Sequence, residues 1–371
     1  KAPPTAVQAQ SIIARTYALR NLRRFKIDNY ELCATTQCQV YRGLDASTSS
    51  VDQAISATTG KVLTYSNELV DALYSSQTGG VTAQFEDVWE GQARPYLRSR
   101  IDAAPNQVWN LDNKPLSDEK NFRQFISLTK GFNEDTWSSF RWKRESPLTE
   151  INQNLREFLK AEQHPLANFG SVQNLVVAKR SRGGRVQQLK VMTDIGEVIL
   201  QKDEILRALD APNSLLFYVD PQSKSVEGES RSLAPGAVAA SQQVLEGFTF
   251  AGGGLGHAVG LSQAGSYRLS NIGYSAEQIL KFYYPGATLQ PLTSSIVYWR
   301  DSQPSTVATQ TVSAQPLSPA TGRPGETTAS NEAPKQDGPE LFGVKLPNIK
   351  FNVLWDWLPF SNLDFEAGQP L

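Results

Sequence analysis

The chain has 371 residues, 40% of them hydrophobic and seven of them tryptophan, which is enough for two or three domains with a sizeable core. Its 36 lysines and arginines are balanced by 37 acidic residues without a basic block, which argues against nucleic acid as the main partner. No run of about 18 apolar residues occurs, so we expect no transmembrane segment. The chain shows no secretory signal and opens on Lys1, inside what reads as a helix; we expect that an upstream segment was processed away or omitted.

The first part of the chain reads as a helix followed by strands. Prolines that are tolerated in a first helical turn precede the run 6–25, which has no Gly or Pro and carries one apolar face. Apolar and polar residues alternate over 31–42, which predicts a strand or paired strands. A short helix over 51–58 and two strands within 61–74, joined near Ser66, are predicted next.

The middle of the chain changes from helical to β patterning. The segment 103–168 contains helix-like runs at 118–129 and 148–162, and we interpret it as an inserted helical subdomain. From residue 171 the pattern predicts strands, two of which flank a hairpin-type connection at 181–184. Further strands are predicted at 197–200, 214–219 and 293–299, with helices at 203–209 and twice within 262–283. The sequence therefore predicts an α+β fold with a mixed or antiparallel sheet.

Two segments at the end of the chain differ from the rest in composition. Residues 301–340 are rich in Ser, Thr, Pro and Ala and have few large apolar groups, so we expect a flexible, disordered linker. The segment 341–371 is aromatic and too short for a domain. It could dock on the main body, bind a partner or touch a membrane interface, and docking is the simplest interpretation.

Residues 254–265 read GLGHAVGLSQAG and contain His257, one of only two histidines. Glycines let a backbone approach its neighbours closely, and Ser262 and Gln263 stand where a helix is predicted to begin. A helix start offers free N–H groups to a polar ligand. On this pattern alone, a binding loop and a structural glycine-rich turn are equally good readings.

The order of several motifs separates these readings. The segment 254–265, with ILKFYYPG at 279–286, resembles the closing motif of the stage II sporulation protein D / amidase-enhancer (LytB-type) family. Further blocks come in that family's order: AQSIIARTY at 9–17, CQVYRG at 38–43, GGVT at 79–82, DVW at 87–89, PYL at 95–97, GRV at 184–186 and ILR at 205–207. The resemblance spans residues 1–300, which we therefore interpret as a glycan-binding domain of this family.

The resemblance implies a protein that acts on bacterial cell-wall glycan outside the cytoplasm, in the periplasm or cell envelope. Peptidoglycan glycan strands are the expected partner, a cell-wall amidase is a second candidate partner, and no cofactor is expected. The first helix is expected to line the cleft. The substrate-binding residues implied by the matched motifs are Arg15, Tyr17, Gln39, Tyr41, Ser76, Gly79, Gly80, Thr82, His257, Ser262 and Gln263.

The two cysteines are separated by five positions, at Cys33 and Cys38. Some members of the resembled family bind zinc with a histidine beside the second cysteine, but this chain has Gln37 there. Because zinc takes four ligands, we expect no metal and leave a disulfide and free thiols open.

A lytic transglycosylase needs one carboxylic acid to protonate the glycosidic oxygen, while the C6 hydroxyl of the sugar attacks the anomeric carbon. The resemblance places the catalytic Glu of active members at Thr5, and Ser75 replaces a family histidine. Threonine cannot serve as a general acid in the working pH range. The acid is therefore unknown, with Glu86 and His257 as weak candidates to replace it.

Three functions remain in competition. The first is a glycan-binding protein with weakened or lost lytic transglycosylase activity. The second is an active lytic transglycosylase that cuts peptide-stripped glycan with a different acid. The third is a non-enzymatic amidase enhancer or an envelope interaction protein.

Overall fold

The computed structural model describes residues 2–35, 37–41, 43, 47–227 and 241–299, together with two short strands near the C-terminus. The described residues up to Trp299 belong to one compact unit. The predicted linker at 301–340 and aromatic segment at 341–371 lie almost wholly outside the described residues. Only β12 (Glu340–Leu341) and β13 (Val344–Lys345) are described there, as an antiparallel pair.

The first helix, α1 (Pro4–Arg20), begins at the predicted prolines, with Pro3 as its N-cap. Its buried side chains are Ala6, Val7, Ala9, Ile12, Ile13, Thr16 and Tyr17. The predicted extension to Phe25 is wrong, because the chain leaves the helix at Asn21 and forms a single 3-10 turn over Lys26–Asp28. Asparagine favours helix ends because its short amide competes for backbone hydrogen bonds.

The first core packs elements from both ends of the compact unit around α1. They are α2 (Ser49–Ala57), β1 (Lys61–Tyr65), β2 (Glu68–Leu69), α6 (Gln263–Asn271), α7 (Ala276–Tyr283) and β11 (Thr288–Pro291). The three strands form an antiparallel sheet in the order β11-β1-β2. Ser66 and Asn67 both have positive φ, which suits the two-residue turn predicted between β1 and β2.

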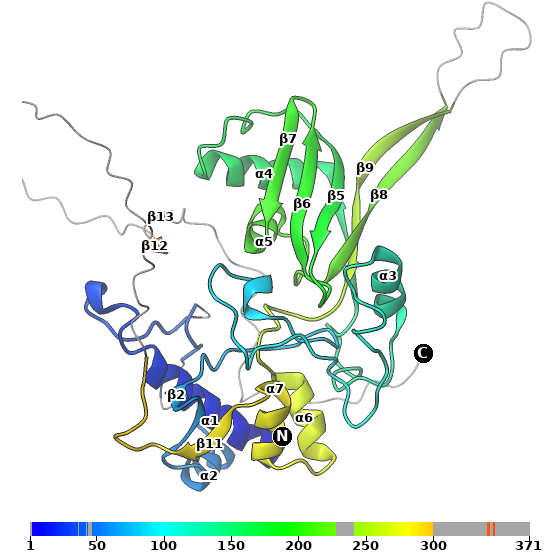
Figure 1. Ribbon diagram of the computed structural model, residues 1–371. Helices are drawn as coiled ribbons and strands as arrows, with labels where there is room; N and C mark the ends of the chain where they lie inside the picture. The colour runs from blue at the N-terminus through cyan, green and yellow to red at the C-terminus, as the bar shows by residue number, and fades with distance from the viewer. Residues whose placement is uncertain are drawn as a thin grey trace, which may run out of the picture. The chain divides into compact units, whose positions relative to one another are not determined.

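A second core lies between strands and helices of the middle of the chain. The antiparallel sheet of β5 (Val172–Arg180), β6 (Val186–Thr193) and β7 (Gly196–Gln201) packs with α4 (Leu148–Ala161) and α5 (Asp203–Leu209) (Figure 1). Leu155, Leu189 and Phe250 are among its fully buried side chains. The predicted hairpin at 181–184 and the predicted helices and strands over 148–209 are confirmed.

A long hairpin of β8 (Phe217–Glu227) and β9 (Ser241–Gly252) joins the second core to a third. β9 also pairs with β4 (Trp142–Pro147), which lies between the two predicted helices of the segment 103–168. The first of those two helices, α3 (Glu119–Ser127), packs Phe122 and Phe125 into the third core. The segment 103–168 therefore contributes to two cores and to a sheet. An α+β fold with mainly antiparallel pairing is confirmed.

Two predicted strands are not found at their predicted places in the described residues. The described residues of 31–41 include no strand, and a disulfide joins Cys33 to Cys38, whose Cα atoms are 5.6 Å apart. An extended strand would separate them by roughly 17 Å. No strand forms at the predicted 293–299. Instead β11, at 288–291, pairs with β1, and Val297 makes only an isolated bridge to Glu68.

Candidate functional site

The parallel pairing of β3 (Tyr74–Ser75) with β10 (Leu261–Ser262) brings two of the sequence motifs together. It places the loop 76–80 beside the start of α6. Ser262 is the N-cap of α6, as predicted, and its side chain accepts a hydrogen bond from the Gly265 N–H. Ser262 is fully buried, whereas Gln263 is partly exposed and its amide reaches Gln10 on α1.

The glycines of these motifs allow two backbone segments to touch. Gly79 and Gly254 have positive φ, and a Cβ on Gly79 would lie 2.5 Å from the carbonyl carbon of Gly253. A Cβ on Gly80 would lie 2.6 Å from the ring of Phe132. Both glycines of the GG pair are buried. They are therefore required for packing between backbone segments and a neighbouring ring.

A buried acid, Glu134, holds the loop. Its carboxyl accepts hydrogen bonds from the N–H of Thr78 (2.6 Å), the N–H of Gly79 (2.8 Å) and the hydroxyls of Thr78 and Ser262. Glu134 is 0% exposed. Four donors from two distant segments therefore converge on one carboxyl, which fixes the loop against the start of α6.

A second buried acid, Asp102, lies on the other side of Thr78. Its Oδ2 lies 3.0 Å from the Thr78 hydroxyl oxygen, and its carboxyl accepts hydrogen bonds from the Asn133 amide (2.7 Å) and the Tyr283 hydroxyl (2.9 Å). Burial, followed by the nearby charge of Glu134, raises the pKa of Asp102 well above its ordinary value. Tyr283 belongs to the FYYPG motif, so this part of the motif has a structural role.

Two arginines, the partly exposed Arg141 and the buried Arg185, bind carbonyl groups of this region. Arg141 donates to the Gly79 carbonyl at 2.9 Å, and Arg185 donates to the carbonyls of Thr78 and Val81. Burial lowers the pKa of Arg141 to about 9 and that of Arg185 to about 10. The Glu134 carboxyl thus binds N–H groups of the loop, and the guanidinium groups of Arg141 and Arg185 bind its carbonyl groups.

His257 packs beside Trp89, with ring centroids 5.0 Å apart, and both side chains are partly exposed. Its Nδ1 accepts a hydrogen bond from the Val259 N–H at 3.0 Å. Burial lowers the pKa of His257 to about 4, partly offset by a hydrogen bond to the Tyr74 backbone. A neutral imidazole at pH 7 agrees with Nδ1 acting as a hydrogen-bond acceptor.

The predicted site residues of the first helix and of the cysteine loop do not line the region around the loop 76–80 but contact other parts of the chain. Arg15 donates to the carbonyls of Thr58 and Lys61, both at 2.8 Å, and so joins α1 to the end of α2. Tyr17 is buried in the first core. Gln39 bridges the Ala14 carbonyl and the Tyr74 hydroxyl, and Tyr41 is exposed.

Thr82 is buried and positions two arginines. Its hydroxyl donates to the Arg98 carbonyl at 2.7 Å and accepts from the Arg100 N–H at 2.9 Å. Its own N–H donates to the Arg100 carbonyl at 2.9 Å. Because Thr82 is only 2% exposed, its contribution to a ligand site acts through Arg98 and Arg100.

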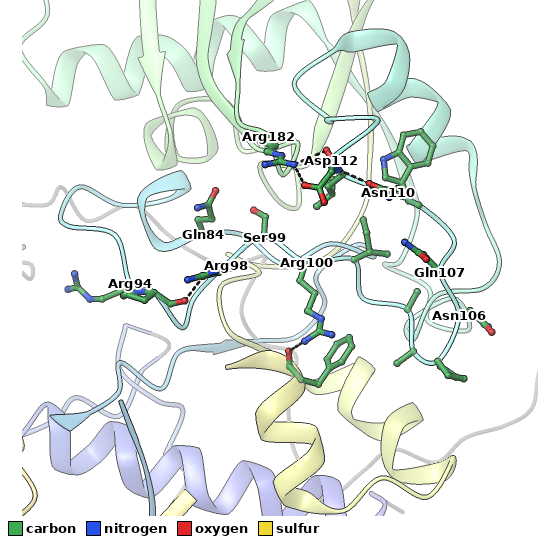
Figure 2. A pocket seen from close by; sticks show the side chains of 18 of the residues that line it. Gln84, Arg94, Arg98, Ser99, Arg100, Asn106, Gln107, Asn110, Asp112 and Arg182 are labelled. Atoms are coloured by element: carbon green, nitrogen blue, oxygen red, sulfur yellow. Dashed lines mark hydrogen bonds and ion pairs between the residues drawn. The ribbon is translucent and has the colours of Figure 1, made fainter. Parts of the chain in front are cut away.

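These two arginines line a cavity of about 1010 Å³, which Figure 2 shows from close by. Glu86 and Tyr274 also line it. Thr5 does not line it; its hydroxyl donates to the Tyr274 carbonyl at 2.8 Å and contacts the Ser270 hydroxyl. Among the sequence-predicted site residues, Glu86 is therefore the one that reaches this cavity.

The charged residues around the loop could not be predicted from the sequence. Asp102, Glu134, Arg141 and Arg185 stand in no motif that marks them as a cluster, apart from the arginine of GRV at 184–186. Their partners lie far along the chain, so no local spacing could have revealed them. Among the residues that the structure describes, no three His, Cys, Asp or Glu side chains gather in a way that could hold a metal ion.

Comparison with known proteins shows which proteins the chain resembles. A family model described as stage II sporulation protein matches residues 1–65, and one described as a domain of unknown function matches residues 83–260. The amidase enhancer of Bacillus subtilis (strain 168) is 29% identical over 296 residues, covering 76% of this chain and 38% of that protein. These matches support the stage II sporulation protein D / amidase-enhancer family for this chain.

Two further relatives match this chain. Stage II sporulation protein D of the same Bacillus is 30% identical over 111 residues, covering 26% of this chain and 32% of the relative. An uncharacterized protein of Brachyspira hyodysenteriae is 24% identical over 293 residues, covering 77% of this chain and 61% of that protein. This chain thus spans less than two thirds of each relative. None of its described helices is long and apolar enough to cross a membrane.

Proposed function

We propose that this SpoIID-like chain binds glycan strands of the bacterial cell wall and cleaves them weakly or not at all. Its relationship to an amidase enhancer and a stage II sporulation protein supports a role at the cell wall. The same relationship favours a location outside the cytoplasm and a cell-wall amidase as a second partner.

The position of Thr5 is the observation that carries the weak-cleavage proposal. Thr5 stands where the resemblance expects the catalytic acid, and its hydroxyl is engaged by Tyr274 and Ser270. None of the residues from Pro4 to Arg20 in α1 is acidic. A general acid must come within hydrogen-bond reach of the glycosidic oxygen, and threonine does not supply a proton there.

The two buried carboxyl groups, Asp102 and Glu134, do not replace the missing catalytic acid. Asp102 and Glu134 are both 0% exposed, and each accepts hydrogen bonds that hold the loop 76–80 or its neighbours. A polysaccharide cannot reach them without opening this packing. Their chemistry therefore serves the shape of the loop.

Glu86 supports a second candidate function, an active lytic transglycosylase. It lines the cavity, and its Oε1 accepts a hydrogen bond from the Gln84 amide at 3.2 Å. Its Oε2 is buried and has no hydrogen-bond partner within the described part of the chain. A carboxyl in this setting could deliver a proton to a sugar held in the cavity.

Incubation of the protein with peptide-free glycan strands, followed by mass spectrometry, separates these functions. Binding without new 1,6-anhydromuramic ends supports the proposal. New ends that disappear in Glu86→Gln establish the active enzyme instead. Glu90→Gln is the matched control, because Glu90 is a neighbouring carboxyl that is exposed and ion-paired with Lys202. A protein that binds an amidase but retains no glycan would be an interaction protein.

A further inference from the structure

The sheet of the second core has a free edge at β7. This strand is the last of the order β5-β6-β7, and among the described strands it pairs with β6 alone (Figure 1). None of its residues lines the cavity of about 1010 Å³. β7 therefore offers a surface that the proposed function does not use.

The backbone groups of β7 point alternately toward β6 and toward this free edge. Thr193 and Gly196 flank the two-residue turn between the strands and so form a hydrogen-bonded pair. Every second pair of an antiparallel ladder is hydrogen-bonded, so Val198 binds β6, whereas the N–H and C=O groups of Glu197 and Ile199 point to the free edge. Within the described part of the chain, these outward groups make no hydrogen bond. They are a template for another strand.

The outer face of the same sheet is partly apolar. Val176, Met192 and Ile199 are each at least 40% exposed. In the register of the sheet, Lys190 lies between Val176 and Ile199, and Met192 follows Lys190 two positions along β6. The apolar side chains therefore form one patch that reaches the free edge at Ile199. An exposed apolar patch of this kind marks an interaction surface.

The edge lacks the devices that usually keep strand edges apart. Lysine, proline and β-bulges are the common ones. β7 reads GEVILQ at 196–201, and its pairing with β6 runs without a register shift. Its one charged side chain, Glu197, forms an ion pair with Lys190 on the adjacent strand. The edge is therefore straight, nearly neutral and open to pairing.

We propose that the free edge of β7 pairs antiparallel with β7 of a second copy of this chain, which makes the protein a two-fold symmetric dimer. The symmetric register places Ile199 opposite Ile199 of the second copy, and Glu197 opposite Gln201 of the second copy. Opposed residues of an antiparallel pair have their side chains on the same face, so the two Ile199 side chains meet. The apolar patches of the two copies then become continuous, and no like charges face each other.

This register also uses the free backbone groups. The two Ile199 residues exchange N–H to C=O hydrogen bonds, and each Glu197 N–H donates to the Gln201 carbonyl of the other copy. The Gln201 N–H itself is already bound by Glu204 Oε2 at 2.8 Å. A second copy fits this edge because one two-fold contact covers both free edges with the same residues and closes the assembly.

Sedimentation equilibrium of the full chain over a dilution series measures the dissociation constant of the dimer. Ile199→Lys places two ammonium groups opposite each other at the two-fold axis, and we expect it to raise this constant at least about tenfold. Val176→Lys is the matched control, because it adds the same charge to the same face, on β5 at the far side of β6 from the free edge. Its dissociation constant should stay close to that of the wild type.

Ile199→Cys tests the register directly. The two cysteines of the wild type are joined to each other, so this variant has one free thiol. Opposed hydrogen-bonded residues of an antiparallel pair have Cα atoms about 5.5 Å apart, within the range of a disulfide. Mild oxidation should therefore give a covalent dimer on a non-reducing gel. Ile195→Cys, an exposed position in the turn between β6 and β7, is the control and should give little of it.

A wild type that is monomeric at every concentration, with no crosslink in Ile199→Cys, would overturn the dimer. Equal weakening by Ile199→Lys and Val176→Lys would place the contact on the face of the sheet instead of its edge, and would overturn the pairing. Circular dichroism melting verifies that each variant is folded, and if Ile199→Lys unfolds, the crosslink decides. A monomer that binds an extended segment of another protein along β7 would assign the edge to that partner instead.

Discussion

Asp102 and Glu134 share the hydroxyl group of Thr78, which lies 3.0 Å from Asp102 Oδ2 and 2.9 Å from Glu134 Oε1. A hydroxyl has one proton to donate, so it cannot donate fully to both carboxyl groups. The raised pKa of Asp102 resolves the conflict. With its pKa raised, Asp102 can hold a proton and donate it to the Thr78 oxygen, so that Thr78 in turn donates to Glu134.

The first prediction is that Asp102→Asn keeps the fold and flattens its pH dependence. The folded-state pKa of Asp102 is above the unfolded value, so the folded protein binds more protons between these two values. The free energy of unfolding of the wild type should therefore fall as pH rises above about 4, by up to about 1.4 kcal/mol per pH unit. Urea unfolding at several pH values measures this slope.

Asparagine can donate to Thr78 as the protonated acid does, and it does not titrate. Asp102→Asn should accordingly match or exceed wild-type stability at pH 7, with the difference shrinking toward pH 4. Asp28→Asn, on an exposed side chain, is the control. Equal slopes in wild type and Asp102→Asn would contradict the prediction.

The second prediction concerns Glu134→Gln. This change turns one acceptor oxygen into an NH₂ group facing N–H or hydroxyl donors, which leaves buried donors without a partner. We expect the free energy of unfolding to fall by about 3 kcal/mol, as for other broken buried charged contacts. Urea unfolding measures the loss, with the exposed Glu246→Gln as control. A loss below about 1 kcal/mol would show that the loop does not depend on this acid.

The third prediction tests the hydroxyl group of Thr82 separately from the volume of its side chain. Thr82→Val removes the contacts to the Arg98 carbonyl and the Arg100 N–H, at a cost of about 1–2 kcal/mol in stability. Because both arginines line the cavity and lose a support, calorimetry should show several-fold weaker binding of peptide-free glycan strands. Thr82→Ser keeps the hydroxyl and should bind nearly as well as wild type. Equal affinities of the Thr82→Val and Thr82→Ser variants would show that the Thr82 hydroxyl does not support binding.

The fourth prediction is that the Cys33–Cys38 disulfide contributes modestly to stability. It closes a very short loop, and restricting such a loop in the unfolded chain is worth about 2 kcal/mol. The double variant Cys33→Ala/Cys38→Ala should lose about this amount in chemical unfolding. Adding a reductant should lower the wild type to the same level and leave the variant unchanged; an effect on the variant would point to another cause.

Some features of this protein were determined by short stretches of sequence. The N-cap at Ser262, the turn at Ser66 and Asn67, and α5 over Asp203–Leu209 follow from local hydrogen bonding, backbone preference and hydrophobic periodicity. The order of the motifs likewise indicated the SpoIID/amidase-enhancer family. These signals are local or additive along the chain, and so they can be read without coordinates.

Only the tertiary structure decided where the charges lie. Glu134 meets Ser262 across 128 positions and Tyr283 meets Asp102 across 181, so no spacing rule connects them. Burial then sets the raised pKa of Asp102 and the lowered pKa of His257, and burial depends on every segment packed around a group. The cavity beside Arg98 and Arg100 arises in the same way, because its walls come from segments that only the folded chain brings together.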